Sequence, residues 1–478
     1  MDFINPILSY WIAFVKSLCY NGEKNQSEVI KMNVTLPIRN TIRTDVAVIG
    51  GGVTGISAAV SAARSGVKTM LIESGSFLGG TATAGMVGPF MSCLDAAGKE
   101  QIIRGFFTEF VDAMIAAGGA ISYRDCPGGD SRSGYRTAGH IGVTPFDVEC
   151  LKRTAERLCL SAGADIRCHT TLIAAETEGR RITAVYITDG EGIDRIEADA
   201  FVDATGNASL AAKAGAGTFR GDEDGFVQTA SLFFTIDGVD AAALDAYMDA
   251  HHDMRGRFYM DVIEAGRADG RFPCGTLKLR IYRNPNDTWT VNMAQCDDAF
   301  NELDAAERTR VEIAQREQID RIIAFLRAEI PPLANIRLVA SAGEMGIRES
   351  RRMIGRHLFC LDDVTSAEKF ADRIAVCANS IDIHQKVGVA YTTHTSANYY
   401  IPLSCLISRD MDNLLGAGKC MSADKYAFAA VRVMPPCFAM GEAAGITAAL
   451  ASARGLAVPE VPAADVQAEI LARGGFLG

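Results

Sequence analysis

Residues 45–73 read DVAVIGGGVTGISAAVSAARSGVKTMLIE, and this stretch decides the fold that the chain is expected to adopt. Its first apolar run predicts a buried strand, and the small residues after the glycines predict a helix packed closely on a sheet. A second apolar run follows and ends in an acid. A strand, a glycine turn, a helix and a second strand form the βαβ unit that binds dinucleotides.

Each position in this unit has a physical role in binding a dinucleotide. The first glycine allows a sharp turn, the second lets backbone amides approach a pyrophosphate, and the third lets the helix lie close to the sheet. The helix N-terminus then faces the phosphates, and the acid accepts hydrogen bonds from a ribose. A glycine turn in an ordinary βαβ unit is the alternative. The expected contact residues are Gly50, Gly52, Val53, Thr54, Gly55 and Glu73.

The next loop, SGSFLGGTATAG over residues 74–85, favours FAD over NAD. An NAD-binding domain would pass from its second strand into a plain helix, whereas paired glycines and small hydroxyl residues can follow a second phosphate group and a flat ring. Here the chain resembles the FAD-dependent oxidoreductases with a glutathione-reductase-type flavin fold, and the resemblance extends over residues 45–453. It implies cofactor contacts at Ser74, Gly80, Thr81, Ala82 and Thr83.

The composition sets wider limits on function. With 478 residues and 48% hydrophobic content, the chain is long enough for two or three domains. A formal charge of −11 argues against nucleic-acid or anionic-membrane binding. The 13 cysteines are scattered without a C-x-x-C pair, which excludes an obvious zinc, iron–sulfur or dithiol site. We therefore expect a cytoplasmic protein without a metal site.

The first 40 residues stand apart from the rest. Apolar residues recur at helical spacing over residues 1–20, and residues 21–40 are polar and predict a linker. The stretch lacks a basic start and a cleavage site, and it is too short and polar for a membrane span. We expect it to dock on the protein's own surface or on a partner subunit, with a membrane-surface helix as the alternative.

A second motif follows a series of predicted elements. Helices are expected over 102–117 and 150–162, and strands over 164–173, 181–188 and 196–203. The last strand ends in Ala204, Thr205 and Gly206, which match the second flavin motif of the resembled family. That family continues with an aspartate, where this chain has Asn207, so the role of this position is in doubt.

A third motif lies near the C-terminus. Residues 402–423 predict a strand and a tight glycine loop, and Pro435 opens a helix that runs to about residue 453. The resemblance places the N-terminus of this helix at the pyrimidine edge of the flavin, where the helix dipole stabilises negative charge. Expected cofactor contacts here are Gly418, Lys419, Gly441, Ala443 and Ala444.

These motifs define the expected architecture: an α/β, Rossmann-like FAD-binding domain of the glutathione-reductase type with an inserted α+β substrate domain. The predicted parts are residues 1–40, the N-terminal segment and linker; 41–219 and 402–478, the two parts of the FAD domain; and 220–401, the substrate domain, which includes a helix over 304–328. A second dinucleotide motif is not found, so a separate NADPH domain is not expected.

Candidate catalytic residues lie at the end of the inserted segment. Residues 343–352 carry the sequence GEMGIRESRR, and Asp382-Ile-His384 follows; both match the resembled family. His384 could act as a base, although Asp382 lies too close along a strand to be its simple partner. Arg348 or Arg432 could hold an oxygen-bearing substrate group. The alternative is an ion-pair network that joins the two domains.

Together these features predict an enzyme with FAD as its cofactor, which transfers a hydride between a small oxygenated substrate and flavin N5. A separate redox partner or oxygen would complete the cycle, and a homo-oligomer is a further expectation. Two alternatives stay open: a flavin-dependent lyase or isomerase, and an electron-transfer subunit of a larger complex. Cys420 is expected to line the site passively, and His394 is expected to be structural or to lie at the rim, rather than to react.

Overall fold

The predicted βαβ unit forms at the centre of the molecule. The structure is a computed structural model, and it describes residues 35–222, 225–251, 260–276, 279–296, 298–384, 390–395 and 397–478. Strand β2 (Val46–Ile49), helix α2 (Val53–Arg64) and strand β3 (Thr69–Ile72) follow one another as expected. Both strands are fully buried and pair in parallel.

The unit belongs to a five-stranded parallel sheet in which the three sequence motifs meet. The strand order is β19-β8-β2-β3-β4, and all four pairings are parallel. The first motif follows β2, the second follows β8 and the third follows β19. Because the carboxyl ends of parallel strands lie at one edge, the three motifs come together there. The added strands are β4 (Asp165–Arg167), β8 (Ala200–Asp203) and β19 (Leu414–Gly416).

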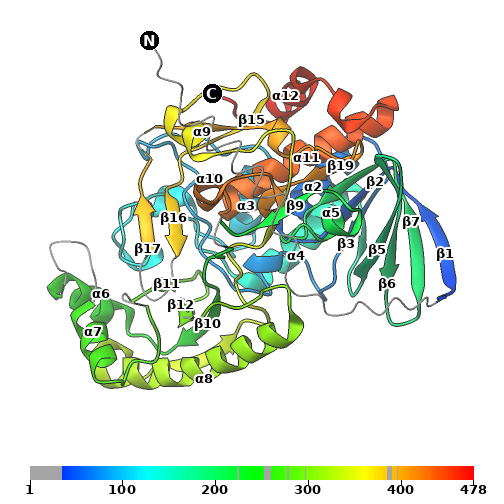
Figure 1. Cartoon of the computed structure of the whole chain (residues 1–478). Helices are drawn as coiled ribbons and strands as arrows, with labels where there is room; N and C mark the ends of the chain where they lie inside the picture. The colour runs from blue at the N-terminus through cyan, green and yellow to red at the C-terminus, as the bar shows by residue number, and fades with distance from the viewer. Residues whose placement is uncertain are drawn as a thin grey trace, which may run out of the picture.

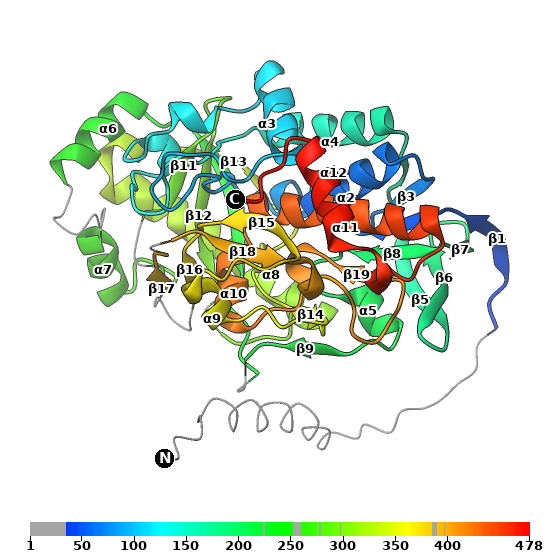
Figure 2. The ribbon, with the colours of Figure 1, turned by 90° about the horizontal axis from the view of Figure 1, so that it is seen from above.

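Helix α11 (Met434–Arg454) packs against α2 beside this sheet, and both are buried along most of their length. Figure 2 shows α11 as a long helix beside α2, with the C-terminal helix above it. The other helices of this part are α3 (Phe106–Ala116), α4 (Val148–Ala162), α5 (Ser209–Lys213), α10 (Lys425–Val431) and α12 (Ala463–Ala472).

Two predicted strands are each divided between this sheet and a second one. The strand expected over 164–173 breaks at His169, whose φ is +55°, and the strand expected over 196–203 breaks after Glu197. The second sheet has the order β1-β7-β6-β5 and lies at one end of the molecule (Figure 1). Its strands are β1 (Ile38–Arg43), β5 (Thr171–Glu178), β6 (Arg181–Thr188) and β7 (Ile193–Glu197).

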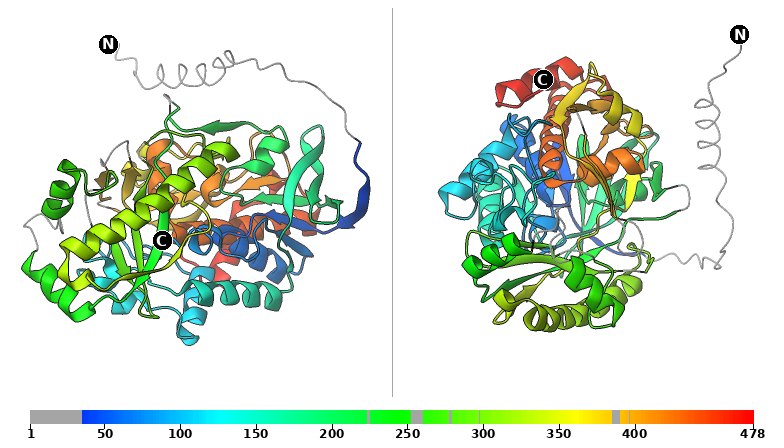
Figure 3. Two further views of the ribbon diagram at one scale, coloured as in Figure 1. Left: turned by 90° about the horizontal axis from the view of Figure 1, so that it is seen from below. Right: turned by 90° about the vertical axis from the view of Figure 1, so that its left-hand side faces the viewer.

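A third, antiparallel sheet comes from the inserted segment and has the order β11-β12-β10-β13. The predicted helix is confirmed as α8 (Ala305–Glu329), whose cap Asp304 accepts a hydrogen bond from the Glu307 amide at 2.9 Å. This helix runs along the sheet on the side away from the rest of the molecule (Figures 1 and 3). The other elements are β10 (Ser231–Asp237), β11 (Ile281–Arg283), β12 (Trp289–Gln295), β13 (Arg337–Ser341), α6 (Ala241–Ala250) and α7 (Met260–Ala268).

Short strand pairs connect the antiparallel sheet to the parallel one. Apolar side chains between Phe359 and Ile407 pack in the same core as α2 and α11, so the chain returns to the first core before β19. The domain limits at 220 and 401 stay predictions. These pairs are β9 (Thr218–Arg220) with β14 (Arg351–Met353), β15 (Arg373–Cys377) with β18 (Tyr399–Pro402), and β16 (Ile381–His384) with β17 (Ala390–Thr393), joined by α9 (Leu361–Ser366).

Two further predictions concern membranes and the N-terminus. In the part of the chain that the structure describes, no single helix has the length and apolar composition of a membrane span, and only the bent pair α10 and α11 meets those criteria jointly. The amphipathic segment predicted over residues 1–20 lies outside the described residues.

Candidate active site

The glycine turn after β2 is shaped by contacts that only glycine permits. Gly50 has a φ of +100°, and a Cβ there would lie 2.6 Å from the Ala204 carbonyl oxygen. A Cβ on Gly55 would lie 1.8 Å from the Gly50 oxygen. Gly52 differs, because a Cβ there would have no atom within 4 Å. The turn is therefore packed on two sides and open at Gly52.

Helix α2 begins beside this opening without a side-chain cap. Its N-cap is Gly52, so no side chain satisfies the free amides of the first turn, where Val53 and Thr54 lie. Helix α11 also begins without a side-chain cap. Uncapped amides and the positive end of a helix dipole attract anionic groups such as phosphate.

Glu73 lies at the end of β3, beside the turn. One carboxylate oxygen accepts a hydrogen bond from the Gly51 amide at 2.6 Å, and the other accepts from the Gly75 amide at 2.6 Å and from Ser74 Oγ at 3.1 Å. The acid therefore fixes the glycine turn to the start of the next loop.

That loop folds back against the turn. The Gly79 amide donates to the Gly51 oxygen at 2.8 Å, and a Cβ on Gly80 would lie 3.0 Å from the Cα of Gly52. Gly80, Thr81 and Ala82 form a short 3-10 helix, and Thr83 Oγ1 donates to the Leu78 oxygen at 2.9 Å.

The second and third motifs meet at Lys419. Thr205 Oγ1 donates to the buried Asp203 carboxylate at 2.6 Å, and Gly206 turns with a φ of +77°. A Cβ on Gly206 would lie 3.1 Å from Lys419 Cε, and Lys419 Nζ donates to the Ile347 oxygen at 2.9 Å. Burial lowers the pKa of Lys419. This side chain thus connects the flavin motifs to the segment that carries Arg348.

Gly441, Ala443 and Ala444 lie inside α11 and not at its N-terminal end. A Cβ on Gly441 would lie 2.2 Å from the Thr54 carbonyl oxygen of α2. Ala443 and Ala444 are fully buried in the same apolar core. The structure gives these three residues a helix-packing role.

Two further residues near the motifs also have structural roles. Asn207 Oδ1 accepts from Ser209 Oγ at 2.6 Å, and its backbone oxygen accepts from Arg351 Nε at 3.2 Å. Cys420 Sγ is buried and accepts from the Gly206 amide at 3.1 Å, and burial raises the pKa of this thiol. The thiol therefore stays protonated.

His384 forms a partly buried cluster with Asp382 and with Arg432, another of the candidates. Its Nε2 lies 3.0 Å from Asp382 Oδ2, and Arg432 Nη2 lies 3.3 Å from the same oxygen and 2.9 Å from the Asp382 carbonyl. The expectation that Asp382 is too close along the strand to pair with His384 was wrong. Both side chains lie on one face of β16, and the imidazole is long enough to turn back to the carboxylate.

The electrostatics keep the imidazole neutral. Burial and the positive charge of Arg348 lower the pKa of His384 to about 3, against the opposing effect of Asp382. Burial raises the pKa of Asp382, but the opposing effects of His384, Arg432 and Arg280 are larger together. The pKa of this carboxyl therefore lies well below its usual value. If the Nε2 proton points to Asp382, Nδ1 is the acceptor nitrogen, and the described residues offer it no hydrogen-bond partner.

Arg348 is also buried and faces the same cluster. It donates to the Thr229 oxygen at 2.6 Å and to Ser231 Oγ at 2.9 Å, both neutral acceptors. Burial, together with the charges of Arg432 and Arg280, lowers its pKa to about 9. The three predicted residues Arg348, His384 and Arg432 are therefore brought together by the fold.

Three further residues at this site were not predicted from the sequence as site residues. Arg280 precedes β11, and Arg136 and His140 come from the irregular loop over 122–140. The pKa of His140 is lowered to about 3 by burial and then by Arg136, with Arg280 and Asp382 also acting on it. Arg280 lies in the stretch TLKLRIY over residues 276–282, where Lys278 also alternates with apolar residues, so the sequence offered no signal that singled out Arg280.

The rest of the Arg-Glu-Ser-Arg-Arg segment forms an ionic network, which is the alternative role expected for this segment. Arg352 and Glu349 are fully buried, with Nη2 and Oε1 3.1 Å apart, and Arg352 also donates to the Gly221 oxygen at 2.6 Å. Ser350 Oγ donates to Glu302 at 2.8 Å. Of the five residues, Arg348 serves the candidate site and the others join the two parts of the molecule.

His394 and Tyr399 lie outside the cluster. His394 is exposed, and its Nδ1 lies 2.7 Å from Ser380 Oγ. Tyr399 is fully buried, and its hydroxyl donates to the Asn379 oxygen at 3.1 Å. Neither is placed to act on a substrate beside His384.

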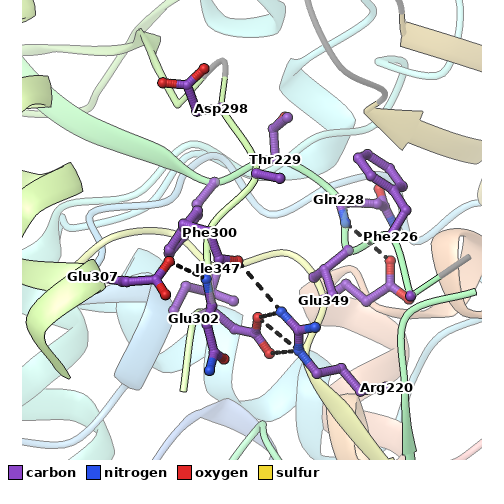
Figure 4. A pocket seen from close by; sticks show the side chains of 15 residues that line it. Arg220, Phe226, Gln228, Thr229, Asp298, Phe300, Glu302, Glu307, Ile347 and Glu349 are labelled. Carbon is purple, nitrogen blue, oxygen red and sulfur yellow. Dashed lines mark hydrogen bonds and ion pairs between the residues drawn. The ribbon is translucent and has the colours of Figure 1, made fainter. Parts of the chain in front are cut away.

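A pocket of about 510 Å³ adjoins the cluster. Figure 4 shows Gln228, Thr229, Ile347 and Glu349 around it, with the ion pair of Arg220 and Glu302 on one side. Gln228 and Thr229 also bond to the cluster, because Gln228 Oε1 accepts from the His384 amide at 3.2 Å. The pocket and the cluster thus share a wall.

The geometry fits a nucleotide cofactor: an open glycine turn, an uncapped helix and three motifs at one sheet edge define a dinucleotide-binding α/β protein. The chain matches the FAD dependent oxidoreductase family over residues 45–470 and belongs to this family. It is an enzyme, and its cofactor is FAD. No curated protein sequence matches it.

Several solved structures resemble the chain at low identity. A p-nitrophenol 4-monooxygenase from Pseudomonas putida DLL-E4 shares 11% identity, covers 91% of this chain and 85% of its own, and gives a TM-score of 0.45. An L-amino acid deaminase from Proteus myxofaciens shares 12% identity over 90% and 94%, with a TM-score of 0.44. A geranylgeranyl bacteriochlorophyll reductase-like protein from Thermoplasma acidophilum shares 13% over 91% and 83%, with a TM-score of 0.43.

Proposed function

We propose that this enzyme transfers a hydride between a small oxygenated organic substrate and flavin N5, in a flavin domain of the glutathione-reductase type. The observation that carries the proposal is the partly buried cluster of His384, Asp382 and Arg432. Arg432 immediately precedes Val433, the N-cap of α11. The cluster therefore adjoins the helix end that is expected to face the flavin.

The proposed cofactor contacts follow from the glycine turn after β2 and the uncapped start of α2. The amides around Gly52, Val53 and Thr54 would bind the pyrophosphate, because this side of the turn is open. Glu73 would accept a ribose hydroxyl with the lone pairs that its two backbone bonds leave free. The other proposed contacts are Gly50, Gly55, Ser74, Gly80, Thr81, Ala82, Thr83, Ala204, Thr205, Gly206, Gly418 and Lys419; Gly441, Ala443 and Ala444 would support α11 from within the core.

FAD, when bound, supplies the two-electron chemistry at N5. His384 Nδ1 would take the substrate hydroxyl proton, since the imidazole is neutral and this nitrogen is free to accept. Asp382 holds the ring orientation through Nε2 and stabilises the positive charge that forms on it. Arg348 and Arg432, whose side chains are largely buried, would hold the substrate oxygen.

The two electrons left on the flavin must leave the enzyme in a second half-reaction. We propose that a separate redox protein accepts these electrons and the protons pass to solvent, or that oxygen accepts two electrons and two protons to give hydrogen peroxide, since the sequence carries one dinucleotide motif. Docking through residues 1–20 and homo-oligomer formation remain proposals, as does a cytoplasmic location.

Anaerobic stopped-flow measurement of flavin bleaching by candidate alcohols and hydroxy acids tests the reaction. His384→Gln should slow bleaching about 100-fold or more, because general-base catalysis contributes at least that factor. His394→Gln is the matched control, because His394 is exposed and lies just after the neighbouring strand β17, and this variant should bleach at the wild-type rate. A His384→Gln enzyme that bleaches as fast as wild type would exclude the proposed base. Turnover without bleaching would favour the non-redox alternative.

A further inference from the structure

The candidate site holds far more positive than negative charge. Arg136, Arg280, Arg348 and Arg432 act electrostatically on one another or on the two histidines. Asp382 acts on Arg280, Arg348, Arg432, His140 and His384. Glu349 also acts on Arg432, but its charge is balanced by its own partner, Arg352. Both histidines are neutral at pH 7, since burial lowers each pKa to about 3. Four arginines less one aspartate leave a formal excess of three positive charges.

Arg280 lies on the side of β11 that faces this site. Its backbone oxygen accepts from the Asn292 amide at 2.9 Å, so it continues the strand, and its side chain points to the same face as that of Tyr282, two residues later. The Tyr282 ring stacks on His140 with ring centres 6.1 Å apart and planes at 9°. Burial lowers the pKa of Arg280.

The Arg280 guanidinium has no partner in the described part of the chain. It takes part in no hydrogen bond or ion pair there, and its Nε is buried without an acceptor. The Nε of Arg432 is also buried without an acceptor. Arg280 and Arg432 are partly exposed as residues, but their Nε atoms are buried, and a buried donor without an acceptor is costly. The free donors therefore indicate a missing negative group.

We propose that Arg280, together with the free donors of Arg432 and the charge of Arg348, binds a carboxylate group of the substrate. A carboxylate matches the planar, two-pronged donor edge of a guanidinium. The substrate of the proposed reaction is a small organic molecule, so we assign the missing negative group to a carboxylate. The excess positive charge would also attract phosphate, and the titration with inorganic phosphate below distinguishes the two. That the bound carboxylate belongs to a substrate rests on the proposed function. That a carboxylate binds at this site does not depend on it.

A bound carboxylate would also raise the pKa of His384, the proposed base. The positive charges of Arg348 and Arg280 lower the pKa of His384, and an anion between the guanidiniums would cancel part of that effect. The imidazole would then accept a proton more readily when an acid occupies the site than when the site is empty.

Binding of unreactive acids to the oxidised holoenzyme tests the proposal without turnover. Acetate, malonate and benzoate would be titrated by calorimetry at pH 7, each beside its neutral amide and beside inorganic phosphate. We expect at least one acid to bind, and its amide to bind about 10- to 100-fold more weakly, the factor for a hydrogen bond to a charged group. Arg280→Gln should weaken binding of the acid by a similar factor, and Arg280→Lys should weaken this binding less.

The matched control is Arg283→Gln. This arginine lies on the same strand, but its side chain is exposed and pairs with Asp287 at 2.7 Å, so acid binding should not change. Equal affinity for acid and amide, tighter binding of phosphate, or no binding of any acid would overturn the proposal. It would also be overturned if Arg280→Gln released FAD while keeping acid affinity. Loss of flavin bleaching with intact acid binding would instead count against the hydride-transfer function alone.

Discussion

At the scale of a single residue, a substitution at Gly52 should change cofactor binding without changing stability. A Cβ there would meet no atom within 4 Å, and its φ of −67° suits alanine, so Gly52→Ala should fold with unchanged stability. The added methyl group would occupy the space proposed for the pyrophosphate. We expect FAD affinity to fall about 10-fold or more, equivalent to about 1.4 kcal/mol.

Fluorescence titration of the apoprotein with FAD measures this affinity, and chemical denaturation of the apoprotein measures stability. Gly190→Ala is the control, because this glycine is exposed, also meets no atom within 4 Å and lies far from the motifs in sequence. If Gly52→Ala binds FAD as tightly as Gly190→Ala, the pyrophosphate does not lie at this turn.

The two buried histidines predict how stability depends on pH. His140 and His384 each have a pKa of about 3 in the folded protein, whereas an unfolded histidine titrates near its ordinary value of 6.5. Below pH 6.5 the unfolded chain binds more protons, so the free energy of unfolding falls as pH decreases towards 3. The loss approaches about 1.4 kcal/mol per pH unit for each histidine.

Urea denaturation between pH 7 and pH 4 checks this dependence. His140→Gln removes one of the two groups, so its stability should fall less steeply over that range than that of the wild type. The exposed His394→Gln variant should keep the wild-type slope. Equal slopes in all three proteins would show that His140 is not held neutral by the fold.

At the scale of elements, the contact between α2 and α11 depends on glycine. A Cβ on Gly441 would lie 2.2 Å from the Thr54 oxygen, and one on Gly445 would lie 2.2 Å from the Ala58 oxygen. Both neighbours are backbone atoms of a buried helix and cannot move away independently. Gly441→Ala should therefore destabilise the protein by about 1–3 kcal/mol or more, although alanine is the better helix former.

Chemical denaturation of the holoenzyme measures this effect, with Gly190→Ala again as the control. A stabilised Gly441→Ala variant would mean that the helices are farther apart than the structure shows. Because α11 and α2 also carry the two uncapped N-termini, we expect the variant to bind FAD more weakly as well.

At the scale of the whole molecule, the pair of Glu349 and Arg352 joins strand β14 to the parts around it. Both side chains are fully buried, and Arg352 lies over the rings of Phe219 and Phe428, 4.6 and 5.0 Å from their centres. Removing one member leaves an uncompensated buried charge. Glu349→Leu or Arg352→Met alone should cost about 3–5 kcal/mol, and the double variant should cost less than the sum.

A double-mutant cycle by chemical denaturation provides the measurement. Arg409→Met serves as a surface control. The Arg409 side chain is exposed and lies outside this pair, so its loss should change stability little. Additive costs for Glu349→Leu and Arg352→Met would show that the two residues are not coupled, and that the network does not join the sheets.

The sequence determined the βαβ unit, the three motifs and the cofactor class, because these depend on local patterns: a glycine turn, apolar strands and an uncapped helix start. It could not place the breaks at His169 and after Glu197, since which sheet a strand joins depends on partners far along the chain. Nor could it pair His384 with Asp382, or bring Arg136, His140 and Arg280 to the same site. The pair within β16 depends on how the imidazole turns back along the strand, which the sequence does not show. The segments that carry Arg136 and His140, Arg280, and His384 are more than 90 residues apart, so only tertiary packing brings them together. The sequence alone therefore identified the cofactor and predicted its anchor, whereas the tertiary structure alone decided the charge and geometry of the proposed substrate site.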